Sequence, residues 1–177
     1  MKENIKKISI IGGPGTGKST LANNLENELN IPVYHIDAIN YLENWNTRDK
    51  KQRDEIILNK INQSSWIMDG TYRSTLKERV EQADLVIFLN YSKFARIKGI
   101  LSRCLKNRGK EKTDIPGCKE RMTFTFLKFT FNWEKNRIQL INKVLEKNPE
   151  NKVIIFKNRK KLNKWYFENF KKKMKIL

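Results

Sequence analysis

The sequence predicts an α/β fold in which a parallel, doubly wound sheet carries helices on both faces. Five short apolar runs are typical of strands, and helical patterns separate them along the chain. Strands that alternate with helices form parallel sheets, and right-handed crossovers place the helices on both faces. The second observation is a glycine-rich stretch between the first strand and the first helix. The length of 177 residues favours a single domain, residues 1–177.

The glycine-rich stretch fits the phosphate-binding pattern Gly-x-x-x-x-Gly-Lys-[Ser/Thr]. It comprises Gly12, Gly13, Pro14, Gly15, Thr16, Gly17, Lys18, Ser19 and Thr20. Gly12, Gly15 and Gly17 permit positive φ, so backbone N–H groups approach a phosphate closely at the start of a helix. In this pattern Lys18 reaches the β- and γ-phosphates, and the Ser19 hydroxyl is a ligand of Mg²⁺. These nine residues are predicted to bind ATP.

Two carboxylates follow predicted strands at the edge where open α/β sheets bind ligands. Asp37 follows the strand predicted over 33–36, and Asp69 follows the strand predicted over 66–68. We expect Asp37 to orient or deprotonate an acceptor hydroxyl. Asp69 is expected to hold Mg²⁺ through water, although Asp69-Gly70 is also a common turn pair. His35 is the only histidine, and a lone histidine is expected to be a packing residue.

The other elements follow from the spacing of apolar residues and from helix signals. Strands are predicted at 85–89 and 152–156, and helices at 48–62, 75–82, 93–107 and 160–173. Ser74 is expected to cap the second of these helices. On the third helix, Phe94, Ile97, Ile100, Leu101 and Leu105 are predicted to face inward. Arg96 and Arg103 share a face of that helix, with surface charge as the alternative role.

Residues 119–146 contain neither glycine nor proline, although the aromatic residues at their start partly alternate as in a strand. The uninterrupted length favours one long helix with its aromatic side chains in the core. Before it, residues 108–118 are rich in cations, glycine and proline. Arg108, Lys110 and Lys112 give this segment the composition of a mobile lid that carries cations to a phosphate. A plain surface loop is the alternative.

The net charge of +18 favours anionic partners. Non-specific binding of nucleic acid is one expectation, and a solvated lysine-rich surface is the alternative. No run of about 18 apolar residues exists, so no membrane helix is expected. The chain enters its first strand directly, and Cys104 and Cys118 lack metal-ligand spacing. A cytoplasmic protein without a leader peptide is therefore expected.

The sequence resembles the DNA topology modulation proteins of FlaR type, in the adenylate-kinase-like branch of the P-loop NTPases. The resemblance spans nearly the whole chain. It rests on the phosphate-binding loop and on three further stretches, residues 32–37, 66–74 and 117–121. These stretches read Pro-Val-Tyr-His-Ile-Asp, Trp-Ile-Met-Asp-Gly-Thr-Tyr-Arg-Ser and Gly-Cys-Lys-Glu-Arg.

The resemblance implies a nucleoside- or nucleotide-kinase-like P-loop fold with the strand order 2-3-1-4-5 and a small lid. This order would place Asp69 beside Ser19. The resemblance also implies that Arg73 holds the phosphate of the acceptor and that Arg103 begins the lid. The family has arginines where this chain has Gly99 and Lys112, and Arg96 lies one helical turn before Gly99.

These observations together predict an ATP-dependent phosphotransferase that acts on a nucleoside, a nucleotide or another small acceptor. ATP and Mg²⁺ are the expected cofactors. Lys18, Asp37 and Arg103 are the predicted catalytic residues, and Asp37 and Arg73 are predicted to bind the acceptor. The alternative is a nucleotide-regulated protein that binds nucleic acid and affects DNA topology. The strand-end residues favour the enzyme, whereas the net charge of +18 favours the alternative.

Overall fold

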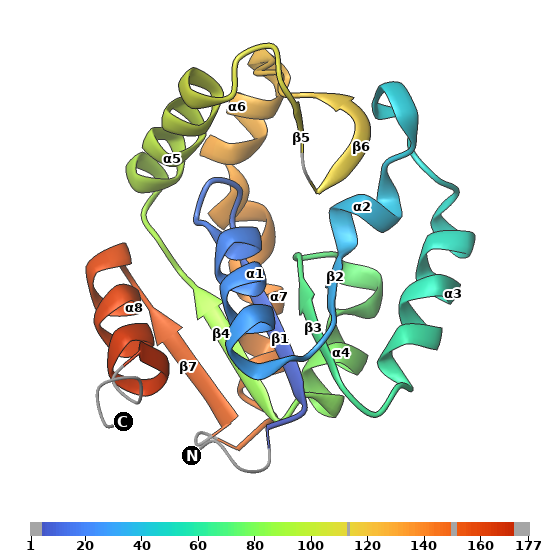
Figure 1. The fold of residues 1–177 in the computed structure, drawn as a ribbon, viewed down its shortest axis with the longest axis vertical. Helices are drawn as coiled ribbons and strands as arrows, with labels where there is room; N and C mark the ends of the chain where they lie inside the picture. Colours follow the sequence, from blue (N-terminus) through green and yellow to red (C-terminus); the bar gives the residue numbers. More distant parts are fainter. Residues whose placement is uncertain (1–4, 113, 150–151, 172–177) are drawn as a thin grey trace.

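A five-stranded parallel sheet forms the centre of the protein in a computed structural model that describes residues 5–112, 114–149 and 152–171 (Figure 1). The strand order is β2-β3-β1-β4-β7. The strands are β1 (Lys7–Gly12), β2 (Val33–His35), β3 (Trp66–Asp69), β4 (Leu85–Leu89) and β7 (Val153–Phe156). Because β7 is the fifth strand of this sheet in chain order, the predicted order 2-3-1-4-5 is confirmed.

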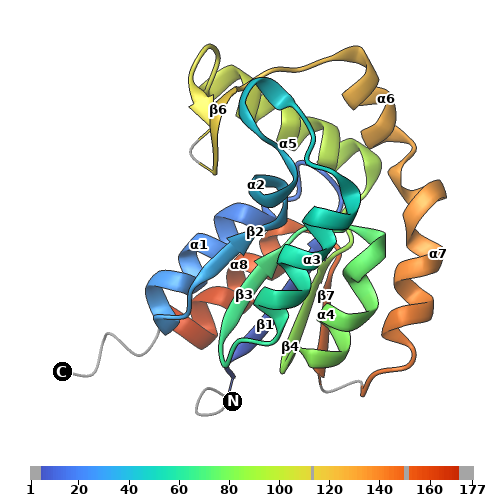
Figure 2. The same ribbon diagram turned by 90° about the vertical axis from the view of Figure 1, so that its right-hand side faces the viewer.

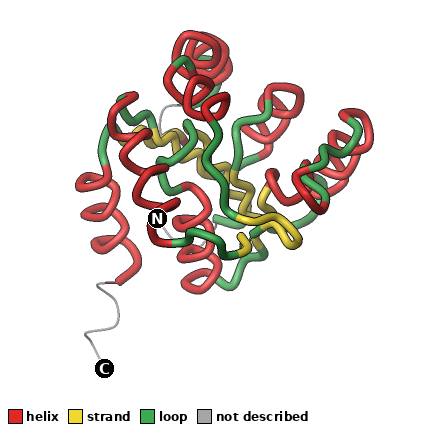
Figure 3. Tube along the Cα trace, turned by 90° about the horizontal axis from the view of Figure 1, so that it is seen from above, coloured by secondary structure: helices red, strands yellow, loops and turns green. Residues whose placement is uncertain are grey.

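Helices follow or connect these strands, as expected for right-handed crossovers. They are α1 (Lys18–Leu29), α2 (Ile36–Asn40), α3 (Lys50–Ile61), α4 (Leu76–Gln82), α5 (Lys93–Lys106), α6 (Phe124–Phe131), α7 (Trp133–Leu145) and α8 (Arg159–Tyr166). Short 3-10 turns lie at Glu43–Trp45 and Arg73–Thr75, and a π-helical turn follows α8 at Phe167–Lys171. Seen from above, the strands lie between helices on both sides (Figure 3).

Two apolar clusters bury the two faces of the sheet. Side chains of α1 and α8, such as Leu25 and Leu162, pack on one face with Ile8 and Ile10 of β1. Side chains of α3, α4 and α7 pack on the other face, together with Ile11 of β1. Because both faces are covered, the strands are nearly continuous apolar runs rather than alternating ones. Figure 2 shows α3, α4 and α7 on one side of the strands and α1 and α8 on the other.

The strand register brings the predicted site residues to one edge of the sheet. β1 lies between β3 and β4, and Ile10 of β1 is opposite Asp69 of β3. His35, the last residue of β2, is also opposite Asp69. The phosphate-binding loop begins where β1 ends, so it starts at the same edge. Parallel strands end together at this edge, which is why local motifs far apart in the sequence meet there.

The segment predicted as one long helix over 119–146 has a different structure, and that prediction is wrong. Its first residue, Lys119, ends the strand β6 (Ile115–Lys119), which pairs with β5 (Glu111–Lys112) in an antiparallel hairpin. The remainder contains two helices, α6 and α7, which meet at Asn132. The hydroxyl of Thr123 accepts a hydrogen bond from the backbone N–H of Phe126, so α6 has its own N-cap.

The inward face predicted for α5 is also wrong at three positions. Phe94 and Leu105 are 70% and 78% exposed, and Leu101 is exposed as well. Arg96 is instead completely buried on this helix, together with Ile100. The helix turns this face inward because Gly99 lies directly against the carbonyl oxygen of Gly15 in the phosphate-binding loop. The close approach of these two backbones decides which face of α5 turns inward. The spacing of apolar residues does not predict such an approach.

Two smaller predictions also need correction. Ser74 does not cap α4, because the N-cap of that helix is Thr75 and makes no side-chain cap bond. Of the aromatic residues expected in the core over 119–146, Phe124, Phe129 and Phe131 are exposed, whereas Trp133 is buried. Residues 172–173 of the predicted last helix lie outside the described residues. None of the described helices is long and apolar enough to cross a membrane.

Candidate active site

The phosphate-binding loop joins β1 to α1, and hydrogen bonds within the loop stabilise its shape. Gly15 and Gly17 have φ values of 74° and 90°, which the sequence predicts for glycine at these positions. The Thr16 hydroxyl donates to the carbonyl oxygen of Gly13 at 2.9 Å. The Lys18 ammonium donates to the same oxygen at 3.0 Å, so the side chain folds back over the loop. Lys18 therefore lies at the position from which it can contact a bound phosphate.

The charged groups of the predicted site surround Lys18. Burial lowers the pKa of Lys18 below its ordinary value, and the nearby cations Arg103 and Lys112 lower it further. Two carboxylates, Asp37 and Asp69, oppose this shift. Two cations and two carboxylates therefore act on one ammonium group, although the five residues come from distant parts of the sequence. An anion of high charge density, such as a polyphosphate, would find three cations at this point.

Asp69 connects the start of α1 to the end of β2. Its Oδ2 accepts a hydrogen bond from the Ser19 hydroxyl at 2.8 Å. Its Oδ1 lies 2.5 Å from Nδ1 of His35. Burial lowers the pKa of His35, but the hydrogen bond and the charge of Asp69 outweigh burial and raise it. His35 thus has a specific polar partner, which sequence analysis did not predict.

The oxygen atoms of Ser19 and Asp69 fit the coordination chemistry of Mg²⁺. This ion prefers oxygen ligands, keeps several waters, and is usually bound by one or two protein groups together with phosphates. Both carboxylate oxygens of Asp69 already have protein partners, which favours contact through water. Among the described residues no group of three or more His, Cys, Asp or Glu forms a separate metal cluster.

Asp37 lies in the first turn of α2, immediately after β2, at the same edge. The Tyr72 hydroxyl donates a hydrogen bond to Oδ1 of Asp37 at 2.9 Å. Burial and the charge of Asp37 raise the pKa of Tyr72, and they raise that of Tyr41 as well. Two tyrosines therefore stay protonated beside this carboxylate. The second oxygen of Asp37 is the one that could accept a proton from an acceptor.

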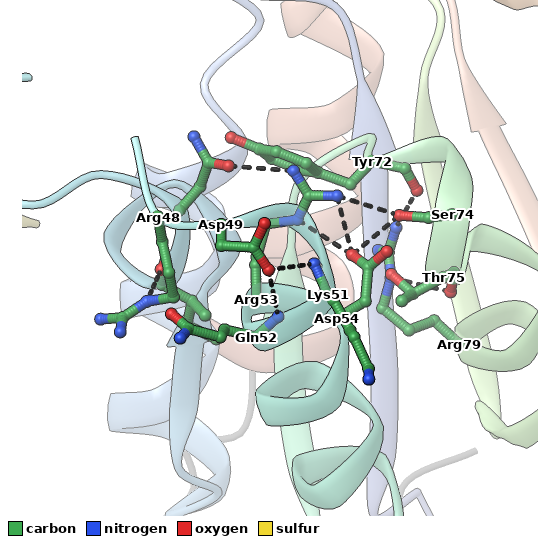
Figure 4. A network of polar contacts seen from close by, with 12 residues as sticks. Arg48, Asp49, Lys51, Gln52, Arg53, Asp54, Tyr72, Ser74, Thr75 and Arg79 are labelled. Atoms are coloured by element: carbon green, nitrogen blue, oxygen red, sulfur yellow. Dashed lines mark hydrogen bonds and ion pairs between the residues drawn. The ribbon is translucent and has the colours of Figure 1, made fainter. Parts of the chain in front are cut away.

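Arg79 holds the loop that follows β3 and carries Arg73. Its guanidinium donates to three backbone carbonyls, those of Gly70 at 2.9 Å, Tyr72 at 3.2 Å and Thr75 at 3.2 Å (Figure 4). Arg79 is completely buried, and burial lowers its pKa to about 10 while Asp69 opposes the shift. A buried guanidinium satisfied by backbone oxygens fixes the path of this loop.

The opposite side of this loop contacts α3. Arg53 forms an ion pair with Asp54 at 2.7 Å, and the Ser74 hydroxyl donates to Asp54 at 2.8 Å (Figure 4). The guanidinium carbon of Arg53 also lies 4.9 Å from the centre of the Tyr72 ring. These contacts explain why Ser74 is unavailable as a helix cap. The Arg53 guanidinium also supports the Tyr72 ring.

Arg137 of α7 is a site residue that sequence analysis missed. Its positive charge interacts with Arg73 and Tyr72, and burial together with Arg73 lowers its pKa. Its Nε is buried and makes no hydrogen bond, while its guanidinium lies 5.9 Å from the centre of the Phe129 ring. The charges of two arginines from separate elements therefore interact near Tyr72, the hydrogen-bond partner of Asp37. No local motif surrounds Arg137, because it lies within α7, and only the packing of that helix brings it to the site.

Arg96 supports the phosphate-binding loop from behind. Its guanidinium donates to the carbonyl of Tyr91 at 2.6 Å, to Glu134 at 2.8 Å and to the carbonyl of Thr130 at 3.3 Å. Its carbon atoms lie so close to Gly13 that a Cβ on that glycine would overlap them. Arg96 is completely buried, so the alternative role of surface charge does not hold for it. Its guanidinium is buried behind the loop and paired with Glu134.

The predicted lid segment, residues 108–118, contains the strand β5 and most of β6, with Thr113 outside the described residues. Arg103 bonds Glu120 at the base of this hairpin, with both Nε and Nη2 at 3.1 Å from Oε1. Lys112 lies 3.5 Å from Asp114. Arg108 and Lys110 are exposed. Of the three predicted lid cations, Lys112 is thus the one that acts on Lys18.

A further cation lies beside the loop. One guanidinium nitrogen of Arg159, at the start of α8, is 3.4 Å from the position that a Cβ on Gly17 would occupy. The element that carries Arg159 follows β7, at the same edge of the sheet as the other site residues. Sequence analysis predicted this helix over 160–173 and assigned Arg159 no role. The order of the strands brings it to the phosphate-binding loop.

Comparisons with known proteins agree with this architecture. A sequence family described as an AAA domain matches residues 7–92, a little under half of the chain. An uncharacterized protein from Eubacterium ventriosum has a TM-score of 0.50 and 15% identity, over 94% of this chain and 99% of its own. A shikimate kinase from Acinetobacter baumannii, solved in complex with shikimate, has a TM-score of 0.56 and 16% identity. That match covers 99% of this chain and 97% of the kinase.

Curated protein sequences gave no match. The family match covers the phosphate-binding loop, Asp37, Asp69 and Arg73. The solved structures match over 94% and 99% of this chain. Identities this low carry the likeness to the fold and no further. The chain therefore has a kinase-like P-loop fold.

Proposed function

We propose that the protein is an ATP-dependent phosphotransferase that transfers the γ-phosphate of ATP to a small acceptor such as a nucleoside or nucleotide. One observation carries this proposal. Two carboxylates and two further cations act on Lys18 at the edge of the sheet where β1, β2 and β3 end. Phosphoryl transfer depends on positioning and on charge neutralisation more than on covalent participation of the protein, and this set of groups supplies both.

Each group has a role that its position supports. The backbone of the phosphate-binding loop and Lys18 bind the β- and γ-phosphates of ATP. Asp37 accepts the proton of the acceptor hydroxyl, and the hydroxyl oxygen forms a bond to the γ-phosphorus. The bond from that phosphorus to the β–γ bridging oxygen breaks, and ADP leaves with the bridging oxygen. Arg103 and Lys112 neutralise the charge on the transferred phosphoryl group.

Mg²⁺ would be held by the Ser19 hydroxyl and, through water, by Asp69. When bound, the ion neutralises phosphate charge and orients the β- and γ-phosphates. His35 keeps Asp69 in place through the contact of 2.5 Å with Oδ1. Tyr72 keeps Asp37 in place through the hydrogen bond of 2.9 Å. Each carboxylate thus has one partner that fixes its orientation.

The acceptor is proposed to carry an acidic group. The charges of Arg73 and Arg137 interact near Tyr72, the partner of Asp37, and the Nε of Arg137 is buried without a hydrogen bond. A phosphate or carboxylate between the two guanidinium groups would relieve their repulsion. The shikimate kinase of the same fold was solved with a small molecule, shikimate, which supports a small acceptor here.

A screen for ADP release tests the proposal. Wild type, Lys18→Ala and Lys128→Ala are incubated with ATP·Mg²⁺ and with nucleosides, nucleotides and small hydroxy acids in turn. We expect acidic acceptors to stimulate ADP release in wild type and in Lys128→Ala, where an exposed lysine is removed. Lys18→Ala is expected to show no stimulation. Stimulation that survives Lys18→Ala would assign the activity to something other than this site.

One observation favours a second function. The net charge of +18 suits a nucleotide-regulated protein that binds nucleic acid through its basic surface. In that case ATP would change the affinity for DNA, and no acceptor would stimulate ADP release. The two functions therefore make opposite forecasts for the same two measurements.

A further inference from the structure

Trp45 joins two segments that are far apart in the sequence. It lies in the segment 41–47, which follows α2, and it contacts the lid hairpin formed by β5 and β6. Its indole Nε1–H donates to the carbonyl of Lys119 at 3.0 Å. Arg121 and Lys112 face its ring, with the guanidinium carbon at 4.9 Å and the ammonium at 5.6 Å from the ring centre. Figure 1 shows the hairpin beside the turn that follows α2.

The hairpin contributes a buried thiol and a glycine to the same contact. The backbone N–H of Trp45 donates to Sγ of Cys118 at 3.3 Å, and the thiol donates to the carbonyl of Leu42 at 3.3 Å. Gly117 has φ 72°, and a Cβ there would lie 2.7 Å from Cγ of Glu43. Cys118 is completely buried although its hairpin is short. The lid hairpin is thus fitted to the segment 41–47 by side chains and backbone.

The backbone of Trp45 is held in an uncommon conformation. Asn44 and Trp45 have φ values of 57° and 64°, the left-handed region that a bulky residue rarely occupies. Such a conformation persists where the surroundings over-determine it. Here the surroundings are the hydrogen bonds to Lys119 and Cys118 and the two facing cations. The contact with the hairpin is therefore what holds Trp45 in this conformation.

The other end of the segment 41–47 reaches the proposed acceptor site. Tyr41 packs edge-on against Trp45 with ring centres 5.2 Å apart, and its pKa is raised by burial and by the charge of Asp37. A bridge between Tyr41 and Thr47 closes the segment at its base. The base of the segment therefore lies beside Asp37, while its tip holds a lid cation, Lys112.

We propose that Trp45 is a positioning residue that makes the segment 41–47 and the lid hairpin move as one unit. Closing the unit brings Lys112 toward the phosphate-binding loop and Tyr41 toward Asp37 in a single step. Lid closure and acceptor enclosure are then coupled, so the cations of the lid meet the phosphates when the acceptor side is also closed. This inference rests on the proposed function for its purpose, but the coupling itself needs no turnover to be observed.

Amide hydrogen exchange in the full chain tests the coupling. In the free protein, Trp45→Leu is expected to speed exchange in the hairpin by about tenfold or more, because its contact with the segment 41–47 is lost. Trp45→Phe keeps a ring for Arg121 but loses the indole N–H, so a smaller acceleration is expected. Leu42→Ala is the matched control, since this exposed side chain lies in the same segment. Amide hydrogen exchange in Leu42→Ala is expected to equal that in wild type.

A second arm uses a non-hydrolysable ATP analogue with Mg²⁺. In wild type the analogue is expected to slow exchange in the hairpin and also in the segment 41–47. In Trp45→Phe it is expected to slow the hairpin while protecting the segment 41–47 less. A merely structural role for Trp45 would not separate these two responses. The reciprocal variant, Arg121→Ala, is expected to speed exchange in the segment 41–47, because coupling between two elements is mutual.

Amides of β1 and β3 report the global fold in every sample. If Trp45→Leu accelerates them as well, the variant has unfolded and the Trp45→Phe comparison decides. Unchanged exchange of the hairpin in a folded Trp45 variant would overturn the coupling. Equal protection of both segments by the analogue in Trp45→Phe would overturn it too. A protein that lacks kinase activity but shows the free-state acceleration would contradict only the proposed function.

Discussion

The phosphate-binding edge and the cover above it are built in opposite ways. The edge consists of the loop 12–20, His35, Asp37 and Asp69. It rests on strands β1, β2 and β3, which pair in register, and the runs of β1 and β3 are buried. The cover consists of the segment 41–47 and the lid hairpin, whose longest strand is Ile115–Lys119. The members of the cover bond each other through Trp45, Leu42 and Cys118. The edge is thus held by the sheet, and the cover is held largely by itself.

This difference predicts where substitutions will alter binding and where they will alter motion. A charge on a buried sheet edge is preorganised, so its removal is felt in full by a bound phosphate. A cover that is held by a few contacts opens locally at low free energy, as substrate-covering segments must. Substitutions in the two regions should therefore fall on different observables. Those at the edge should alter affinity or chemistry, and those in the cover should alter exchange and closure.

The largest expected effect is on chemistry at the edge. Asp37→Asn keeps the shape of the side chain but removes the proton acceptor, so turnover is expected to fall about 10²–10⁴-fold. The affinity for ATP is expected to be unchanged, because the proposed role of Asp37 is toward the acceptor and not toward ATP. Turnover is measured on an acceptor found in the ADP-release screen, and ATP binding by calorimetry. Wild-type turnover in Asp37→Asn would remove this residue from the chemistry.

A smaller but still large effect is expected at Lys18. Lys18→Ala removes a charged contact to the β- and γ-phosphates, and ATP binding is expected to weaken by about 2–3 kcal/mol. The fold is expected to survive, because the hydrogen bond that Lys18 makes in the protein is to a single loop carbonyl, that of Gly13. Calorimetric titration and thermal unfolding separate the two quantities. Equal affinity in the variant and wild type would show that the loop does not bind ATP through this side chain.

Gly99→Ala tests the contact between α5 and the loop. The new Cβ would overlap the backbone carbonyl of Gly15, and neither backbone can give way cheaply. We expect a loss of about 1–3 kcal/mol in the free energy of unfolding, as for other overpacked sites. Ser102→Ala, at an exposed position of the same helix, is the control and is expected to be neutral. Equal denaturant midpoints for Gly99→Ala and Ser102→Ala would mean that α5 can move away from the loop at no cost.

The smallest expected effect is that of ATP on the affinity for nucleic acid. If the charge of +18 is a solvated surface, DNA binding is non-specific and its affinity falls log-linearly with salt. ATP·Mg²⁺ is then expected to shift DNA affinity by less than about tenfold, or roughly 1.4 kcal/mol. Removal of the basic tail 171–175, of which 172–175 lie outside the described residues, is expected to flatten the salt slope.

A salt series with and without ATP·Mg²⁺ measures this link, and Lys18→Ala serves as the matched variant. Its DNA affinity is expected to equal that of wild type, because the loop binds a nucleotide rather than a duplex. A shift larger than tenfold that disappears in Lys18→Ala would favour the nucleic-acid function over the phosphotransferase. In that case, ATP bound at the phosphate-binding edge would control the affinity of a distant basic surface for DNA.

Local patterns in the sequence were enough to predict the sheet and most of the phosphate-binding edge. The runs at β1, β3 and β4 are continuous and apolar because both faces of the sheet are covered, so composition alone identifies them. The motif around Lys18 is contiguous, since one loop must wrap one phosphate. Asp37 and Asp69 could be placed at the edge because parallel strands all end on the same side. The order of the strands came from the family resemblance, and the structure confirms it.

Only the tertiary structure decided which residues face the site from elements without a motif. Arg79, Arg96 and Arg137 read as ordinary charges on helices, yet two of them are completely buried and the third meets Arg73. The side of α5 that turns inward is set by the approach of Gly99 to Gly15, which apolar spacing cannot report. Trp45 reaches the hairpin through contacts that span more than 70 residues. Short-range propensity determines elements, whereas such long-range contacts exist only after the elements have packed.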